Sequence, residues 1–134
     1  GIAAAFALGA AGVQIGTAYL RTPESKASAL GKAALAAASD DATVITNVMT
    51  GRPARGVANR VMREVGPVSS DAPAFPHAAT AFAPLKAAAE KLGRIDFTNL
   101  WAGQSVALGR ELGAAELTRT LAAEARERLK KLSE

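Results

Sequence analysis

Gln14, Ile15, Gly16 and Thr17 are the residues whose types and order most clearly suggest chemistry. The segment GVQI is rich in β-branched residues and too short for a helix, so we expect a short buried strand over residues 12–15. Gly16 lets an anion approach the main chain closely, and Thr17 offers both an N–H and an O–H donor. At the end of a strand, such a pair indicates either a phosphate-binding turn or a plain crossover in which the glycine serves packing.

Basic residues are densest around the turn TGRPARG, in which Gly51 and Gly56 bracket Arg52 and Arg55. The planar fork of donors on each guanidinium suits a phosphate or a carboxylate. The turn therefore predicts either a position beside a flavin or substrate or a packing contact between two parts of the protein.

Three other features have side chains that are common in active sites. His77 is the only histidine, but it adjoins a proline-rich loop, and we assign it no catalytic role. Gln104 ends the block LWAGQ and offers a neutral donor and acceptor; alternatively, Trp101 anchors a core and Gln104 caps a helix. The pair Asp40–Asp41 has no histidine or third acid nearby, so it indicates the end of a helix, and we predict no metal site.

Apolar spacing predicts a mainly helical chain that would hold these residues in place. A second extended segment is expected over Thr43–Met49 and a loop over residues 66–76. The expected helices are Ala3–Leu8, Thr17–Leu20, Ser25–Ala38, Gly56–Val65, Ala78–Leu92 (broken in two by Pro84), Leu100–Leu108 and Gly113–Leu132.

Composition narrows the class of protein. Hydrophobic residues make up 49% of the 134 residues but aromatic residues only 4%, which favours closely packed helices. The absence of cysteine excludes disulfides and thiolate metal sites, and fits a cytoplasmic protein. The net charge of +4 is dispersed and interleaved with acids, so we predict no nucleic-acid binding. No apolar run reaches the roughly 20 residues of a membrane span, so no membrane association is predicted.

Four blocks together carry a family resemblance: VQIGT, TGRPARG, APAFPHAATAFAPL and LWAGQ. In this order and at these distances they resemble the C-terminal part of bacterial nitronate monooxygenases, formerly called 2-nitropropane dioxygenases. The resemblance covers essentially the whole chain. The combination of blocks is far more specific than any one of them.

The resemblance implies an α/β fold, of which this chain would hold the C-terminal part. Residues 1–22 would be the end of an FMN-binding TIM (β/α)₈ barrel, with its last strand. Residues 23–134 would be a mainly helical cap domain with the C-terminal helix, so the chain itself is expected to be mostly α. Because a barrel needs roughly 250 residues, we expect the chain to be a C-terminal fragment that lacks seven strands.

The activity implied is FMN-dependent oxidation of alkyl nitronates by O₂ to a carbonyl compound and nitrite. Gln14 to Thr17 would contribute to the cradle of the FMN phosphate, and Gly103 and Gln104 would approach the flavin. The histidine that serves as the family's general base would lie on the barrel, upstream of residue 1, so no catalytic residue is assigned within this chain. The oligomeric state is left open, with a homo-oligomer as one possibility. The alternatives are a related flavin-dependent enoyl-acyl-carrier-protein reductase and a non-enzymatic helical module that packs on a partner.

Overall fold

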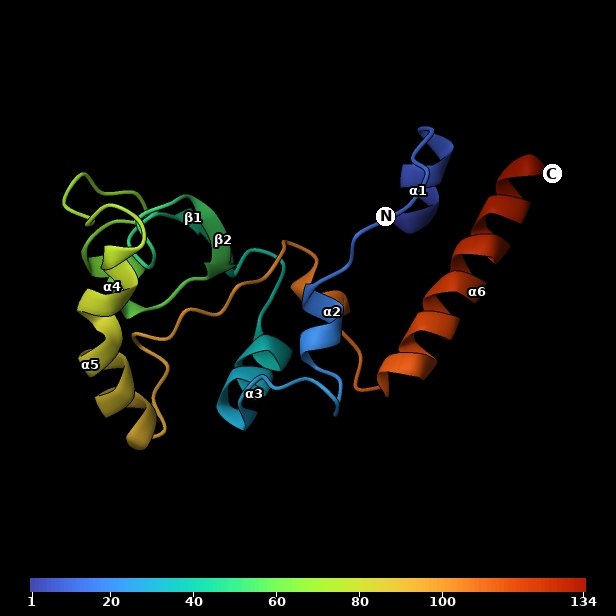
Figure 1. Ribbon diagram of the computed structural model, residues 1–134. Coiled ribbons are helices and arrows are strands. Elements are labelled where there is room, and N and C mark those ends of the chain that lie inside the picture. The colour runs from blue at the N-terminus through green and yellow to red at the C-terminus, as the bar shows by residue number, and fades with distance from the viewer. The chain divides into compact units, whose positions relative to one another are not determined.

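Helices are the predominant regular structure in the computed structural model, which describes residues 1–134 (Figure 1). The only sheet has two strands. The chain divides into two compact units, Gly1–Lys26 together with Arg110–Glu134, and Ala27–Gly109. No helix is both long enough and apolar enough to cross a membrane.

The first unit contains α1 (Ile2–Ala7), α2 (Thr17–Leu20) and α6 (Ala114–Ser133). Helix α6 is amphipathic, as its leucine spacing predicts, and it buries Leu117 and Ala125. An acid in its first turn and lysines in its last turn complement the helix dipole. Helix α1 packs against α6, which brings the two ends of the chain together.

Side chains from the α2 region fasten the start of α6. The Glu24 carboxylate accepts from the main-chain N–H of Ala114 at 3.0 and 3.1 Å, so it caps the helix from outside. The hydroxyls of Tyr19 and Thr118 lie 2.7 Å apart. These contacts hold residues 16–24 on α6 although the two segments are far apart in sequence.

The second unit is built on the hairpin of β1 (Thr43–Thr46) and β2 (Ala54–Val57). The two strands are antiparallel, with Thr43 opposite Val57 and Thr46 opposite Ala54. The remaining elements of the unit are α3 (Ala29–Ala37), α4 (Arg60–Glu64), α5 (His77–Lys91) and the 3₁₀ helix η1 (Val106–Leu108).

The core of the second unit lies between the hairpin, α4 and α5. Its fully buried members are Val48, Met49, Val61 and Met62. Partly buried aromatic side chains pack around them, namely Phe82, Phe97 and Trp101. Three of the chain's few aromatic residues therefore pack in this one small core. Because alanine buries little apolar area, a chain rich in alanine depends on such large side chains.

The structure confirms the short helix α2 and the long helix α6. It also confirms an extended segment from Thr43, which β1 forms as far as Thr46. The strand expected over residues 12–15 is not formed. A strand exists only where a neighbour pairs with its N–H and C=O groups, and this chain places none beside these residues.

Four expected helices were wrong in extent. The helix expected over Ser25–Ala38 begins only at Ala29, after the Ser28 cap. Residues 54–57 form β2 because they pair with β1, and α4 begins only after Asn59, whose side chain caps it. Residues 100–105 are not helical, because Leu100–Ala102 pairs with β2 and leaves only η1 beyond it. Pro84 does not divide its helix, since α5 runs unbroken past it.

Candidate functional site

The predicted anion-binding residues lie in the first unit, in the segment that enters α2. Gln14 and Gly16 are exposed and Ile15 is half-buried. The main-chain N–H groups of these three residues make no hydrogen bond within the chain. These main-chain donors are therefore available to a ligand.

Gly16 is the residue that precedes α2, with φ −106° and ψ −62°. These angles are accessible to any residue, so its conformation does not require glycine. A Cβ built on Gly16 meets no atom of the chain within 4 Å. The open space beside this residue is therefore available to a ligand, and a larger side chain here would compete with that ligand.

In the second unit, the turn TGRPARG is held against the loop that precedes α5. Gly51 has φ +88°, and a Cβ on it would lie 2.3 Å from the main-chain nitrogen of Phe75. Only glycine combines this conformation with this approach. The Arg52 guanidinium lies 4.4 Å from the centre of the Phe75 ring, in a cation–π contact. The turn and the segment APAFP thus form one contact surface.

The side chain of Arg55 is used within the sheet. Its Nη1 atom donates to the carbonyl oxygen of Thr43 at 3.0 Å and to the Thr43 hydroxyl at 3.2 Å. These bonds link β2 to β1 beyond the backbone ladder. Arg52 and Arg55 therefore differ, because the Arg52 side chain is exposed over a ring while Arg55 is half-buried against the neighbouring strand.

The other glycine of the turn, Gly56, contacts the block LWAGQ. Gly56 pairs with Trp101, the N–H of Val57 donates to the Leu100 carbonyl at 2.8 Å, and the N–H of Ala102 donates to the Arg55 carbonyl at 3.2 Å. Leu100–Ala102 is therefore hydrogen-bonded to β2 around an isolated β-bridge between Gly56 and Trp101. The sequence blocks TGRPARG and LWAGQ thus contact each other through backbone hydrogen bonds.

Gly103 and Gln104 follow this segment and are exposed. The Gln104 side chain makes no hydrogen bond within the chain, so it does not cap a helix. Trp101 packs against the core, as one of the two sequence interpretations expected. The carboxamide of Gln104 is free to meet a ligand.

His77 and the aspartate pair take positions without a ligand-binding geometry. His77 is the exposed first residue of α5, and its main-chain N–H donates to the Ala74 carbonyl at 2.8 Å. The Asp41 carboxylate accepts from the Ser39 hydroxyl in the turn after α3. No group of three or more metal-binding side chains occurs in the chain.

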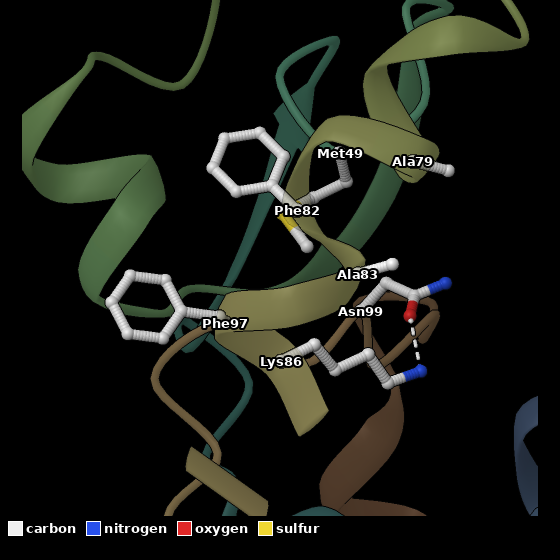
Figure 2. A pocket seen from close by; sticks show the side chains of 7 residues that line it. All are labelled: Met49, Ala79, Phe82, Ala83, Lys86, Phe97 and Asn99. Atoms are coloured by element: carbon white, nitrogen blue, oxygen red, sulfur yellow. Dashed lines mark hydrogen bonds between the residues drawn. The ribbon is translucent and has the colours of Figure 1, made fainter. Parts of the chain in front are cut away.

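The sequence did not suggest a small cavity between α5 and residues 97–99, which Figure 2 shows. Its volume is about 240 Å³, and Met49, Phe82 and Phe97 form most of its apolar wall. Lys86 lies at one end, where its Nζ donates to the Asn99 side-chain oxygen at 3.3 Å. The spacing of Phe82 and Lys86 by four residues was the signal that both share one face of a helix.

Ion pairs on the exposed surface account for the perturbed pKa values. A hydrogen bond from Arg110 lowers the pKa of the Glu124 carboxyl in the first unit, and the same bond raises the pKa of Arg110. Glu64 likewise raises the pKa of Arg60 through a 2.8 Å hydrogen bond.

Comparison with known proteins gives a consistent result. The sequence pattern of the family described as nitronate monooxygenase matches residues 1–124. The nitronate monooxygenase of Pseudomonas aeruginosa is 45% identical over 127 residues, which cover 94% of this chain and 36% of the relative. A probable nitronate monooxygenase of Staphylococcus saprophyticus is 37% identical over 127 residues, covering 95% of this chain and 36% of the relative. The chain therefore spans about a third of the length of these relatives.

Solved structures agree with the sequence comparison. A nitroalkane oxidase from Streptomyces ansochromogenes aligns with a TM-score of 0.85 at 43% identity, over 98% of this chain and 37% of that one. A mutant of FabK from Thermotoga maritima aligns with a TM-score of 0.70 at 28% identity, over 98% of this chain and 39% of that one.

Proposed function

We propose, from the premise that the chain belongs to the nitronate monooxygenase family, that it contributes part of an enzyme for nitronates. The reaction is oxidation of an alkyl nitronate by O₂ to a carbonyl compound and nitrite. The observation that carries this proposal is the direct contact of the turn TGRPARG with both other blocks of the second unit. Gly51 abuts Phe75, and Gly56 abuts Leu100. Three blocks that span 55 residues of the sequence therefore pack together in the folded chain.

The family resemblance implies FMN, and residues 14–17 fit its phosphate. The main-chain N–H groups of Gln14, Ile15 and Gly16 are unused within the chain, and Gly16 leaves open space beside them. Thr17 adds a hydroxyl at the start of α2. The flavin, when bound, would supply the electron chemistry, while these residues hold its phosphate.

For the second unit we propose that Gly103 and Gln104 face the flavin or substrate. Their exposure and the free carboxamide of Gln104 support this role. Arg52 is the better candidate of the two arginines for an anion near the site, because the Arg55 guanidinium is engaged by Thr43. No residue of this chain is proposed as the catalytic base.

For the architecture we propose that residues 1–22 carry the last strand of a TIM barrel and that residues 23–134 comprise the helical cap domain and the C-terminal helix. The β-branched residues Val13 and Ile15 support the first part, since residues 12–15 form no regular structure in this chain and are suited to pairing with strands from elsewhere in a longer protein. Helix α6 belongs to the same compact unit as residues 1–26. The C-terminal helix would then pack on the barrel rather than within the cap.

A flavin-dependent enoyl-acyl-carrier-protein reductase is the second candidate function. It has less support, because the curated relatives described above are named as nitronate monooxygenases. Oxidation of NAD(P)H by the assembled enzyme would favour it. A non-enzymatic packing module would bind no flavin in any context.

A chimeric enzyme tests the proposal. The matching 127 residues of the Pseudomonas aeruginosa relative are replaced by those of this chain, and the product is assayed for bound FMN and for nitrite release from propyl nitronate under air. We expect both. The isolated 134-residue chain with added FMN serves as the control, and we expect no turnover from it. A folded chimera that binds FMN but releases no nitrite would contradict the proposed reaction.

A further inference from the structure

Residues 96–102, the segment that leads to Gln104, are held in place by hydrogen bonds to neighbouring elements. Its backbone is bonded at every second residue from Asp96 to Ala102, through three carbonyl groups and one N–H group, to the start of α4 and to β2. The bonds are Val61 N–H to the Asp96 carbonyl at 3.4 Å, Asn59 Nδ2 to the Thr98 carbonyl at 3.0 Å, Val57 N–H to the Leu100 carbonyl at 2.8 Å and Ala102 N–H to the Arg55 carbonyl at 3.2 Å.

Helix α5 holds the same segment through side chains. The Thr98 hydroxyl donates to the Glu90 carboxylate at 2.7 Å, and Thr98 is only 7% exposed. Lys86 donates to the Asn99 side chain at 3.3 Å, as the dashed line in Figure 2 shows, and its Nζ lies 4.0 Å from the Glu90 carboxylate. The segment is therefore held both by α5 and by β2.

Helix stability alone does not account for a glutamate at position 90. Glu90 lies in the last turn of α5, where the helix dipole disfavours an acid. Its pairing with Lys86 also has the less favourable order, with the cation toward the N-terminus. The interaction that favours Glu90 is its bond to Thr98, two residues before Leu100 begins to pair with β2.

The buried part of the segment ends at Ala102. Ala102 is buried and bonded, whereas Gly103 and Gln104 are exposed. The direction in which the chain leaves Ala102 is therefore set by the contacts of residues 98–102.

We infer that Glu90 is a positioning residue that acts through Thr98. Gly56 contacts the same segment from β2, and together the two residues fix the place of Gln104. The effect of Glu90 on turnover rests on the proposed function, which sets Gly103 and Gln104 toward the flavin. Its effect on the segment itself does not. Glu90 touches neither substrate nor flavin in this scheme.

The chimera tests the effect on turnover. Glu90→Ala removes the acceptor for the Thr98 hydroxyl, and we expect kcat to fall about tenfold with bound FMN unchanged, as for a misplaced group near the reacting atoms. Glu90→Gln keeps a side-chain oxygen as acceptor and should stay within about twofold of the parent. Thr98→Val should reproduce Glu90→Ala, and the double variant should be no worse than either, because both remove one interaction. Lys91→Ala, at the exposed neighbouring position, is the control and should leave kcat unchanged.

A second measurement separates this inference from the proposed function. In the 134-residue chain, the readouts are the NMR signals of the Gln104 side-chain amide and of the indole of Trp101, the only tryptophan. Glu90→Ala and Thr98→Val should shift both signals, while Glu90→Gln and Lys91→Ala should not. If the parent chimera is inactive but these shifts occur, the proposed function fails and the positioning role stands. If Glu90→Ala leaves the Gln104 and Trp101 signals and kcat unchanged, Glu90 does not position this segment.

Discussion

Gly56 of β2 and the backbone of Leu100 lie so close that only glycine fits at position 56. A Cβ on Gly56 would lie 2.8 Å from the Leu100 carbonyl oxygen and 3.1 Å from Cε3 of Trp101. The same carbonyl accepts the N–H of Val57 at 2.8 Å. The block LWAGQ can therefore pack against β2 only because position 56, at the end of the block TGRPARG, is a glycine.

Gly56→Ala should destabilise the second unit because the new methyl group overlaps backbone that is held in a sheet. We expect a loss of about 1–3 kcal/mol in the free energy of unfolding, measured by urea denaturation. Gly12→Ala is the matched control, since a Cβ there meets nothing within 4 Å, and it should change stability by less than about 0.5 kcal/mol. Equal stability of the two variants would contradict the close approach.

Asn59→Ala should be among the most destabilising single changes. The Asn59 side chain is 5% exposed, accepts from the N–H of Met62 at 3.1 Å and donates to the Thr98 carbonyl at 3.0 Å. Its loss removes a helix cap and leaves a buried carbonyl unpaired, at a cost of about 2–3 kcal/mol. Ser28→Ala removes only the cap of α3, the bond to the N–H of Gly31, and should cost about 1 kcal/mol in the same denaturation assay. The reverse order would refute the linking role of Asn59.

Gly16→Val in the chimera should weaken FMN binding, because the branched side chain would fill the open space beside the free N–H groups of residues 14–16. Loss of one or two charge-assisted contacts, at roughly 1.5–3 kcal/mol each, implies about a tenfold or greater rise in Kd. Fluorescence titration with FMN measures it.

His77→Ala is the companion variant, since His77 is an exposed residue at the start of α5. It should leave both FMN content and nitrite release unchanged. Normal FMN affinity in the Gly16 variant combined with lost activity in the His77 variant would move the site to the loop before α5.

Glu124 should titrate below the ordinary carboxyl pKa of 4.5 because Arg110 donates to it in a hydrogen bond at 2.7 Å. A lowered pKa in the folded state means that this pair stabilises the fold above the ordinary pKa. The contribution is lost as the pH falls through the lowered value. Arg110→Gln should raise the pKa of Glu124 in a ¹³C NMR titration. Arg128→Gln should raise it less, since Arg128 contributes only a weaker charge interaction. A larger effect from Arg128 would reassign the cause.

Amide exchange should separate residues 14–16 from the helices in the 134-residue chain. We expect fast exchange at Gln14, Ile15 and Gly16, whose N–H groups are unbonded, and slow exchange in the middle of α6. In the chimera, where strands from the relative are available, Val13 and Ile15 should become protected. Protection of residues 13–15 in the monomeric 134-residue chain would count against their assignment to a barrel strand.

Much of this protein was determined by sequence alone, where a local rule was sufficient. The leucine spacing of residues 117–129 requires a long amphipathic helix, and α6 is that helix. The run of threonine, valine and isoleucine from Thr43 to Thr46 predicted an extended segment, and it is β1. The blocks TGRPARG and LWAGQ also identified the family, because motif identity does not depend on knowing where the blocks lie in space.

Only the tertiary structure decided the elements whose conformation depends on a distant partner. Gly56 and Val57 were expected in a helix from their apolar spacing, yet they are strand residues because β1 and Leu100 supply hydrogen-bond partners. Residues 12–15 have strand-like side chains but no partner strand, so they form no regular structure. Local propensity is worth a few tenths of a kcal/mol per residue, whereas pairing satisfies whole N–H and C=O groups and therefore prevails. The same reason hid the contact of Glu90 with Thr98, since no spacing rule links a helix end to a segment that follows a loop.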